Sequence, residues 1–194
     1  MRSAEEAVHA AEKLGYPVVA KGVSEKVVHK SDLGLVRLGL SDAGAVRNAF
    51  ADIKTALARA GDPDGSNVVI AEMVRGDAEV IIGARYDANF GAQVLVGFGG
   101  VMVEILRDVQ LATAPVSREQ ALAMLRRLKL WPLLDGVRGR PRLDVEAIVE
   151  AVTRVSWLAH DLGDRLRDFE INPLIVRVAG QGAVAVDARG SIGT

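Results

Sequence analysis

The end of the chain carries the pattern that most constrains the fold. Residues 168–176 and 183–188 form two strand-like runs, separated by a short glycine-rich segment. Strands joined by so short a connection pair antiparallel, so the chain is expected to close with a hairpin. Because side chains alternate along a strand, Phe169 and Ile171 share one face while polar residues share the other. The members of this polar stripe are Asp168, Glu170 and Asn172.

The polar stripe has the chemistry of a site for a divalent cation. When the chain folds back near Gly180, Asp187 comes to lie opposite Asn172, or one or two residues diagonal to it, at roughly 5 to 8 Å. Carboxylate and amide oxygens suit a hard ion, and magnesium takes one or two protein ligands while keeping water and substrate phosphates. The same spacing also fits a polar stripe that only faces solvent, so spacing alone leaves both interpretations open.

The rest of the sequence predicts a mixed chain of helices and strands. Ser3 and Glu6 have the spacing of a capping box for an opening helix that stops at Gly15. A buried strand then ends at Lys21, so an apolar run delivers one cation to its end. The further expected elements are an irregular polar segment at 22–34, a strand at 36–40, a helix to about 60, a strand hairpin at 67–74 and 78–86, strands at 92–97 and 101–106, and helices over 117–128 and 145–159.

Composition disfavours several classes of function. The formal net charge is -1, from 24 basic and 25 acidic residues, so no global field attracts nucleic acid or an anionic membrane. The sequence contains no apolar run of about 18 residues and neither a P-loop nor a strict Gly-x-Gly-x-x-Gly. Because the chain has no cysteine, disulfides and thiolate metal sites are excluded, and a cytoplasmic location is expected.

Several short strings occur in the order found in one known family. The string Glu-Ile-Asn-Pro-Leu at 170–174, followed by Val-Asp-Ala-Arg at 186–189, resembles the end of ATP-grasp domains in succinyl-CoA synthetase beta subunits and ADP-forming acetyl-CoA synthetases. The supporting strings are Pro-Val-Val-Ala-Lys at 17–21, His-Lys-Ser-Asp at 29–32, Glu-Met at 72–73, Glu-Val-Ile-Ile-Gly at 79–83, Gly-Phe-Gly-Gly at 97–100 and Arg-Gly-Arg-Pro at 138–141. The resemblance spans nearly the whole chain and is closest to the acetyl-CoA synthetase branch. It implies an α+β ATP-grasp fold, with two lobes of mostly antiparallel sheet around a nucleotide cleft.

The resemblance implies a set of residues that bind ATP or ADP with Mg²⁺. Asn172 and Asp187 would hold magnesium on the nucleotide phosphates, and Lys21 would pair with a phosphate as a point charge. The other implied contacts are Glu72 and Met73 at the adenine edge, Glu79 at the ribose hydroxyls, and Gly99 and Gly100 beside a phosphate or an incoming phosphohistidine loop. An exposed strand carboxylate fits Glu79 equally well, and a plain bend fits the two glycines.

The resemblance also implies a phosphate relay through His29. A neutral imidazole is a good nucleophile toward a phosphoryl group, so a histidine on a loop can accept and pass on phosphate. In the family, a histidine on the partner CoA-ligase domain is phosphorylated first, and the loop histidine matched by His29 carries the group to ADP. Glu170 would orient an imidazole in that pathway. A solvated loop side chain is the alternative for His29.

The whole chain, residues 1–194, is expected to be one ATP-grasp domain with lobes at 1–66 and 67–194, trimmed at its amino terminus relative to the family. The implied function is that of the nucleotide-binding subunit or domain of an ADP-forming acyl-CoA (acetate–CoA) ligase. Such a part needs a CoA-binding partner that carries the first phosphohistidine, and the full enzyme is expected to be an oligomer. The alternative is a non-catalytic ATP-grasp-like module that regulates or scaffolds a protein acetyltransferase.

Overall fold

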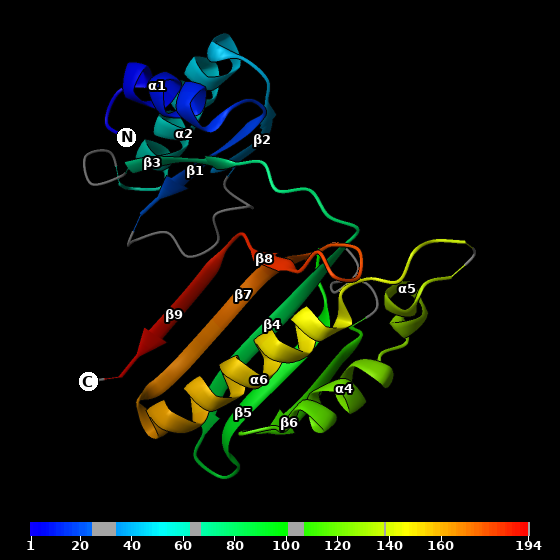
Figure 1. Cartoon of the computed structure of the whole chain (residues 1–194). Coiled ribbons are helices and arrows are strands. Elements are labelled where there is room, and N and C mark those ends of the chain that lie inside the picture. The colour runs from blue at the N-terminus through cyan, green and yellow to red at the C-terminus, as the bar shows by residue number, and fades with distance from the viewer. Residues whose placement is uncertain (25–33, 63–66, 101–106, 138, 194) are drawn as a thin grey trace. The chain divides into compact units, whose positions relative to one another are not determined.

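The chain folds into two compact units, Met1–Met73 and Val74–Thr194, each with its own hydrophobic core. Figure 1 shows the computed structural model. It describes residues 1–24, 34–62, 67–100, 107–137 and 139–193. His29 and the strand expected at 101–106 lie outside these ranges.

The first unit is an antiparallel sheet packed against helices α1 (Ala4–Leu14) and α2 (Ala43–Arg59). The strand order is β2 (Val36–Leu40), β1 (Val18–Val23), β3 (Asn67–Glu72). Every second residue of β1 and β3 enters the core beneath the helices, as Val18, Ala20, Val68 and Ile70 do. Because side chains alternate, Lys21 lies on the other face of this sheet.

Local signals in the sequence set the starts of both helices. Ser3 accepts a hydrogen bond from the backbone N–H of Glu6 at 3.1 Å, which is the first half of the predicted capping box. The Glu6 carboxylate accepts from the N–H of Arg2 at 2.8 Å, one residue before the partner that a capping box uses. Asp42 caps α2 by accepting from the N–H of Ala45 at 2.8 Å, and this contact holds the pKa of the Asp42 carboxyl below its usual value. These caps satisfy backbone donors that have no partner inside the helix.

The second unit is built on one antiparallel sheet. Its strand order is β6 (Val109–Thr113), β5 (Gly91–Phe98), β4 (Ala78–Asp87), β7 (Leu166–Val176), β8 (Ala183–Ala185), and β9 (Ala188–Ile192) also pairs with β7. Helices α4 (Arg118–Arg126) and α6 (Val145–Leu162) cover one face of this sheet (Figure 1). The short helix α5 (Trp131–Asp135) and the 3-10 turn η1 (Gly163–Arg165) complete the described elements.

The two faces of this second sheet differ in what they contact. Val80, Ile82 and Ala84 of β4 point into the core beneath the helices. Residues between them therefore point the opposite way, onto what we call the site face: the face of this sheet turned away from α4 and α6. Gly83 lies on the site face, and its partner Glu170 on β7 shares it because directly paired residues point to the same side.

The predicted hairpin of 67–74 with 78–86 is wrong. The two strands exist, but β3 pairs with β1 in the first unit, whereas β4 pairs with β5 and β7 in the second. Residues 75–77, which connect the two strands, therefore form no hairpin turn. A Cβ at Gly76 would lie 2.3 Å from Ile175 Cγ2, so this glycine allows the chain to pass close to β7.

The unit boundary therefore falls later than the sequence suggests. The predicted lobes meet between 66 and 67, while the compact units meet between Met73 and Val74. The difference is strand β3, whose side chains Val68 and Ile70 fill the first core. The expected closing strand at 183–188 is divided between β8 and β9, and β6 has no counterpart among the predicted elements.

Candidate functional site

The closing strands bring Asn172 and Asp187 together. From Asp168 onward, β7 pairs with β9 up to Ile171 and with β8 from Leu174 in one register, which sets Asn172 opposite Asp187. The backbone N–H of Asn172 donates to the carbonyl of Asp187 at 3.0 Å. The predicted pairing of these two residues across the hairpin is confirmed.

Glu170 and Arg189 fix the orientation of the Asn172 amide. Asn172 Nδ2 lies 2.9 Å from Glu170 Oε1, and Glu170 Oε2 accepts from Arg189 Nη2 at 3.0 Å and Nε at 3.3 Å. An ionised carboxylate can only accept hydrogen bonds, so the amide must present its NH₂ group to Glu170. The Oδ1 atom of Asn172 is then directed away from Glu170 and is available to another partner.

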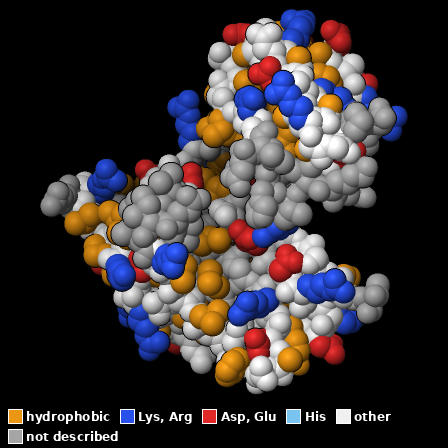
Figure 2. Space-filling model, turned by 180° about the vertical axis from the view of Figure 1, so that it is seen from behind, with side chains coloured by type: hydrophobic (Ala, Val, Ile, Leu, Met, Phe, Trp, Pro, Cys, Tyr) orange, Lys and Arg blue, Asp and Glu red, His pale blue; other side chains and the backbone are white. Residues whose placement is uncertain are grey.

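The donor set fits a hard divalent cation. Asp187 is half-buried, and its carboxylate makes no hydrogen bond or ion pair with the residues that the structure describes. Within the same residues, no group of three or more His, Cys, Asp or Glu side chains is placed to share a metal. One carboxylate and one amide oxygen are what magnesium uses when phosphates and water supply its other ligands. Seen from behind, the surface as a whole carries acidic and basic side chains interspersed with hydrophobic ones (Figure 2).

Glu79, Gly99 and Gly100 form a second group on the same sheet. The N–H of Gly99 donates to the carbonyl of Glu79 at 2.8 Å. Gly100 has a φ of +64°, and a Cβ there would lie 2.8 Å from Glu79 Oε2, so a larger residue would be strained and would displace the carboxylate. Glu79 pairs with Ile175 on β7, three residues from Asn172, which corresponds to roughly 10 Å along the strand.

The remaining described candidates belong to the first unit. Lys21 is half-buried on β1, between Val36 of β2 and Val69 of β3. Glu72 is exposed at the end of β3, and Met73 is half-buried directly after it. The face of this sheet away from the helices thus combines one ammonium group with apolar neighbours.

Sequence reasoning missed Arg189. The string Val-Asp-Ala-Arg contains it, but no role followed from its type alone. The signal was present in the register: once Asn172 stands opposite Asp187, Glu170 must stand opposite Arg189.

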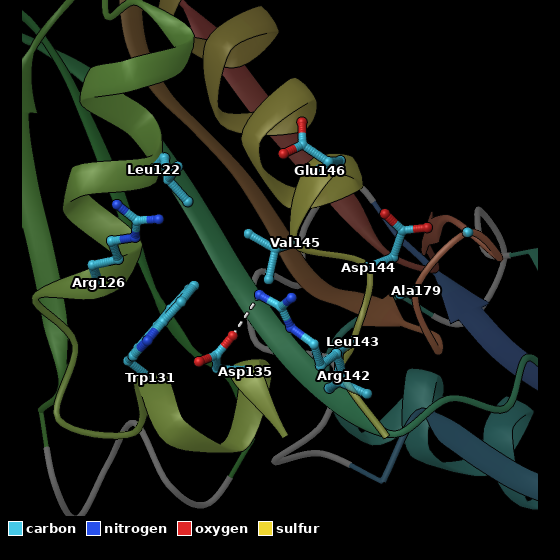
Figure 3. A pocket seen from close by; sticks show the side chains of 11 residues that line it. Leu122, Arg126, Trp131, Asp135, Arg142, Leu143, Asp144, Val145, Glu146 and Ala179 are labelled. Carbon is cyan, nitrogen blue, oxygen red and sulfur yellow. Dashed lines mark hydrogen bonds and ion pairs between the residues drawn. The ribbon is translucent and has the colours of Figure 1, made fainter. Parts of the chain in front are cut away.

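The described part of the chain also contains a pocket of about 440 Å³ in the second unit. Its lining comes from α4, α5, the first turn of α6 and the turn between β7 and β8 (Figure 3). None of the candidate nucleotide or metal residues lines it. Among the described residues, no helix is long and apolar enough to cross a membrane. The cytoplasmic location stays a prediction.

Comparison with known proteins gives concordant matches. A family model for the ATP-grasp domain matches residues 1–192. The beta subunit of acetate–CoA ligase [ADP-forming] II from Pyrococcus furiosus is 38% identical over 190 residues, which are 97% of this chain and 80% of that protein. The 4-hydroxybutyrate–CoA ligase [ADP-forming] of Nitrosopumilus maritimus is 38% identical over 185 residues, covering 95% of this chain but 26% of that protein.

Solved structures agree with the fold. The dinucleotide-forming acetyl-coenzyme A synthetase 1 of Ca. Korarchaeum cryptofilum, in complex with coenzyme A and Ca-AMPCP, matches with a TM-score of 0.88 at 36% identity, covering 100% of this chain and 83% of that one. A second structure of that protein holds Mg-AMPPCP, with its phosphohistidine segment pointing towards the nucleotide binding site, and matches with a TM-score of 0.80 at 35% identity over 97% of this chain and 82% of that one. The predicted α+β fold is confirmed.

Proposed function

Because the chain belongs to the ATP-grasp domain family, we propose that it is the nucleotide-binding part of an ADP-forming acyl-CoA ligase. In the reaction direction that forms ATP, it takes a phosphoryl group from a phosphohistidine and delivers it to ADP. The observation that carries this proposal is the pairing of Asn172 with Asp187, two oxygen donors held opposite each other on one sheet.

Asn172 and Asp187 are proposed to hold Mg²⁺ on the nucleotide phosphates. Bound there, the ion would neutralise charge on the transferring group, which is the main catalytic need in phosphoryl transfer. The chain itself positions the two metal ligands. The strands fix the backbones of both residues, and Glu170 keeps the amide oxygen of Asn172 directed away from its own carboxylate.

Arg189 is proposed to keep Glu170 in this positioning role. Its guanidinium holds Oε2 of Glu170 while Asn172 holds Oε1, so both carboxylate oxygens have protein partners. A carboxylate occupied in this way is a weak competitor for the metal. Glu170 is also proposed to orient the imidazole that delivers the phosphoryl group, as the family resemblance implies.

The remaining residues carried by the family resemblance are also proposed to contact the nucleotide. Lys21 would pair with a phosphate, and Glu72 with Met73 would lie along the adenine edge. Glu79 would bind the ribose hydroxyls, with Gly99 and Gly100 close by. Support comes from the contact between Glu79 and the two glycines, which holds these three residues as one group.

The phosphate path is proposed to run through His29 and a partner. A phosphohistidine on a CoA-binding domain or subunit would give its phosphoryl group to the His29 imidazole, as one N–P bond breaks and another forms. An oxygen of the terminal ADP phosphate would then attack, releasing neutral histidine and forming ATP. The likeness to a beta subunit supports a partner, because such a subunit acts with another part of its enzyme.

The proposal is tested by measuring ADP binding to the chain by calorimetry, with and without Mg²⁺. Magnesium should strengthen binding in the unmodified protein. Asp187→Asn and Asn172→Ala should abolish the strengthening. Asp168→Asn is the matched control, because Asp168 belongs to the same polar stripe but is hydrogen-bonded to Ser191.

Two results would overturn the proposal. The first is a folded protein that binds no ADP in the presence of Mg²⁺, which would favour the regulatory or scaffold module. The second is an Asp187→Asn variant that binds like Asp168→Asn, which would place the metal elsewhere.

A further inference from the structure

The pocket of about 440 Å³ has a composition of its own (Figure 3). Leu122 and Arg126 come from α4, Trp131 from α5, and Val145 from the first turn of α6. A volume of this size falls in the range of small-molecule sites, roughly 300 to 1,000 Å³. The pocket lies within the second unit alone.

Hydrogen bonds fix the walls of the pocket. The N–H of Leu143 donates to Leu134 at 2.9 Å, and the N–H of Ala179 donates to Arg142 at 2.9 Å. Asp144 accepts from the N–H of Ala147 at 3.1 Å and from that of Gly182 at 2.7 Å, which joins the start of α6 to the turn after β7. A pocket held in this way needs little ordering when a ligand binds.

The carboxylates of the pocket are already engaged. Asp135 accepts from Arg142 at 2.6 Å, and Asp144 accepts from two backbone N–H groups. Glu146 accepts from Arg118, which lies outside the pocket lining, at 2.6 Å. The acidic groups therefore have partners without a ligand.

The cations have donors to spare. The exposed side chain of Arg126 forms no hydrogen bond or ion pair with any residue in the described part of the chain, and Arg142 uses only its Nη2 atom for Asp135. A guanidinium fits a carboxylate through two parallel N–H donors. The hydrogen-bond donors in the pocket that have no partner in the described chain therefore belong to guanidinium groups, which bind anions.

Beside these cations and the three carboxylates, the lining is apolar apart from Gly180. Leu122, Leu143, Val145 and Ala179 offer apolar surface, and the indole of Trp131 lies at the same pocket (Figure 3). We propose that the pocket binds a small alkyl carboxylate, with its carboxylate at Arg126 and its chain against the aliphatic lining. The proposal does not depend on nucleotide binding.

Hexanoate is a suitable probe, and Trp131 is a built-in reporter. The chain has two tryptophans, so Trp157→Phe leaves Trp131 as the single one. In that background, hexanoate should change the fluorescence in a saturable way, and calorimetry should give the same affinity. Hexan-1-ol keeps the chain but lacks the charge, and formate keeps the charge but lacks the chain, so both should bind at least about tenfold more weakly.

Two substitutions locate the site. Arg126→Gln should weaken hexanoate binding by about tenfold or more, since it removes a charged donor pair. Arg127→Gln is the matched control, because Arg127 is exposed like Arg126 but lies outside the lining. The proposal is overturned by the absence of saturable binding in both measurements, by equal binding of hexan-1-ol, or by equal affinities of the two variants.

Discussion

Glu170→Ala tests whether Glu170 acts on the metal through Asn172. In the protein as folded, Asn172 Nδ2 lies 2.9 Å from Glu170 Oε1, and the Glu170 side chain is 25% exposed. Removing the carboxylate frees the Asn172 amide to rotate. Magnesium would then have to immobilise this side chain on binding.

The size of the effect follows from this loss of preorganisation. Immobilising one side chain costs about 0.5 to 1.5 kcal/mol, which weakens binding by about two- to tenfold. The variant also leaves Arg189 without its carboxylate partner and close to a cation site. Repulsion between this guanidinium and Mg²⁺ moves the expected loss of Mg²⁺ affinity toward the upper end of that range, about tenfold. The affinity for ADP without magnesium should not change.

The assay is calorimetry with ADP, with and without Mg²⁺, in the absence of any partner domain. Asp168→Ala serves as the control, since Asp168 lies two residues away on the same polar stripe. In an Asn172→Ala background, most of the effect of Glu170→Ala should disappear, because the two residues act through one contact. An equal loss with and without magnesium, or full additivity of the two substitutions, would refute the positioning role.

Three further substitutions have definite expectations. Lys21→Met should weaken ADP binding by about tenfold both with and without Mg²⁺, because a phosphate contact does not need the metal; calorimetry measures this, and an unchanged affinity would contradict it. Gly76→Ala should lower the free energy of unfolding by about 1 to 3 kcal/mol, since its Cβ would meet Ile175 Cγ2; thermal unfolding checks it, and an unchanged midpoint would argue against the close contact. Asp42→Ala should destabilise the chain at neutral pH, because the N–H of Ala45 lowers the pKa of Asp42 from its ordinary 3.8. That stabilisation is present above pH 3.8 and is lost as the pH falls through the lower folded-state pKa. Denaturant titrations should therefore show that the difference in free energy of unfolding between the variant and the unmodified protein becomes smaller at acid pH.

The sequence predicted the elements whose signals are local. The N-cap at Ser3 and the alternation from Asp168 to Asn172 each depend on neighbouring residues, and both correspond to contacts in the structure. The pairing of Asn172 with Asp187 was also accessible, because a short connection allows few registers.

The strand pairing around Gly76 could not be predicted in this way. A Gly between two apolar runs resembles a turn, but the partner of each strand is decided by which core its side chains fill. That choice depends on packing between residues far apart in sequence. Arg189 was missed for a related reason, since its role follows from a cross-strand partner and not from its own segment.

The division of the second sheet into two faces has a practical consequence for engineering. The buried residues of α6, such as Ile148 and Val152, lie on the side of the sheet opposite the site face. Cavity filling or helix optimisation there can make the protein more heat-resistant without altering any side chain of the site face. Heat resistance and the proposed nucleotide contacts of the site face can accordingly be engineered as separate problems in this chain.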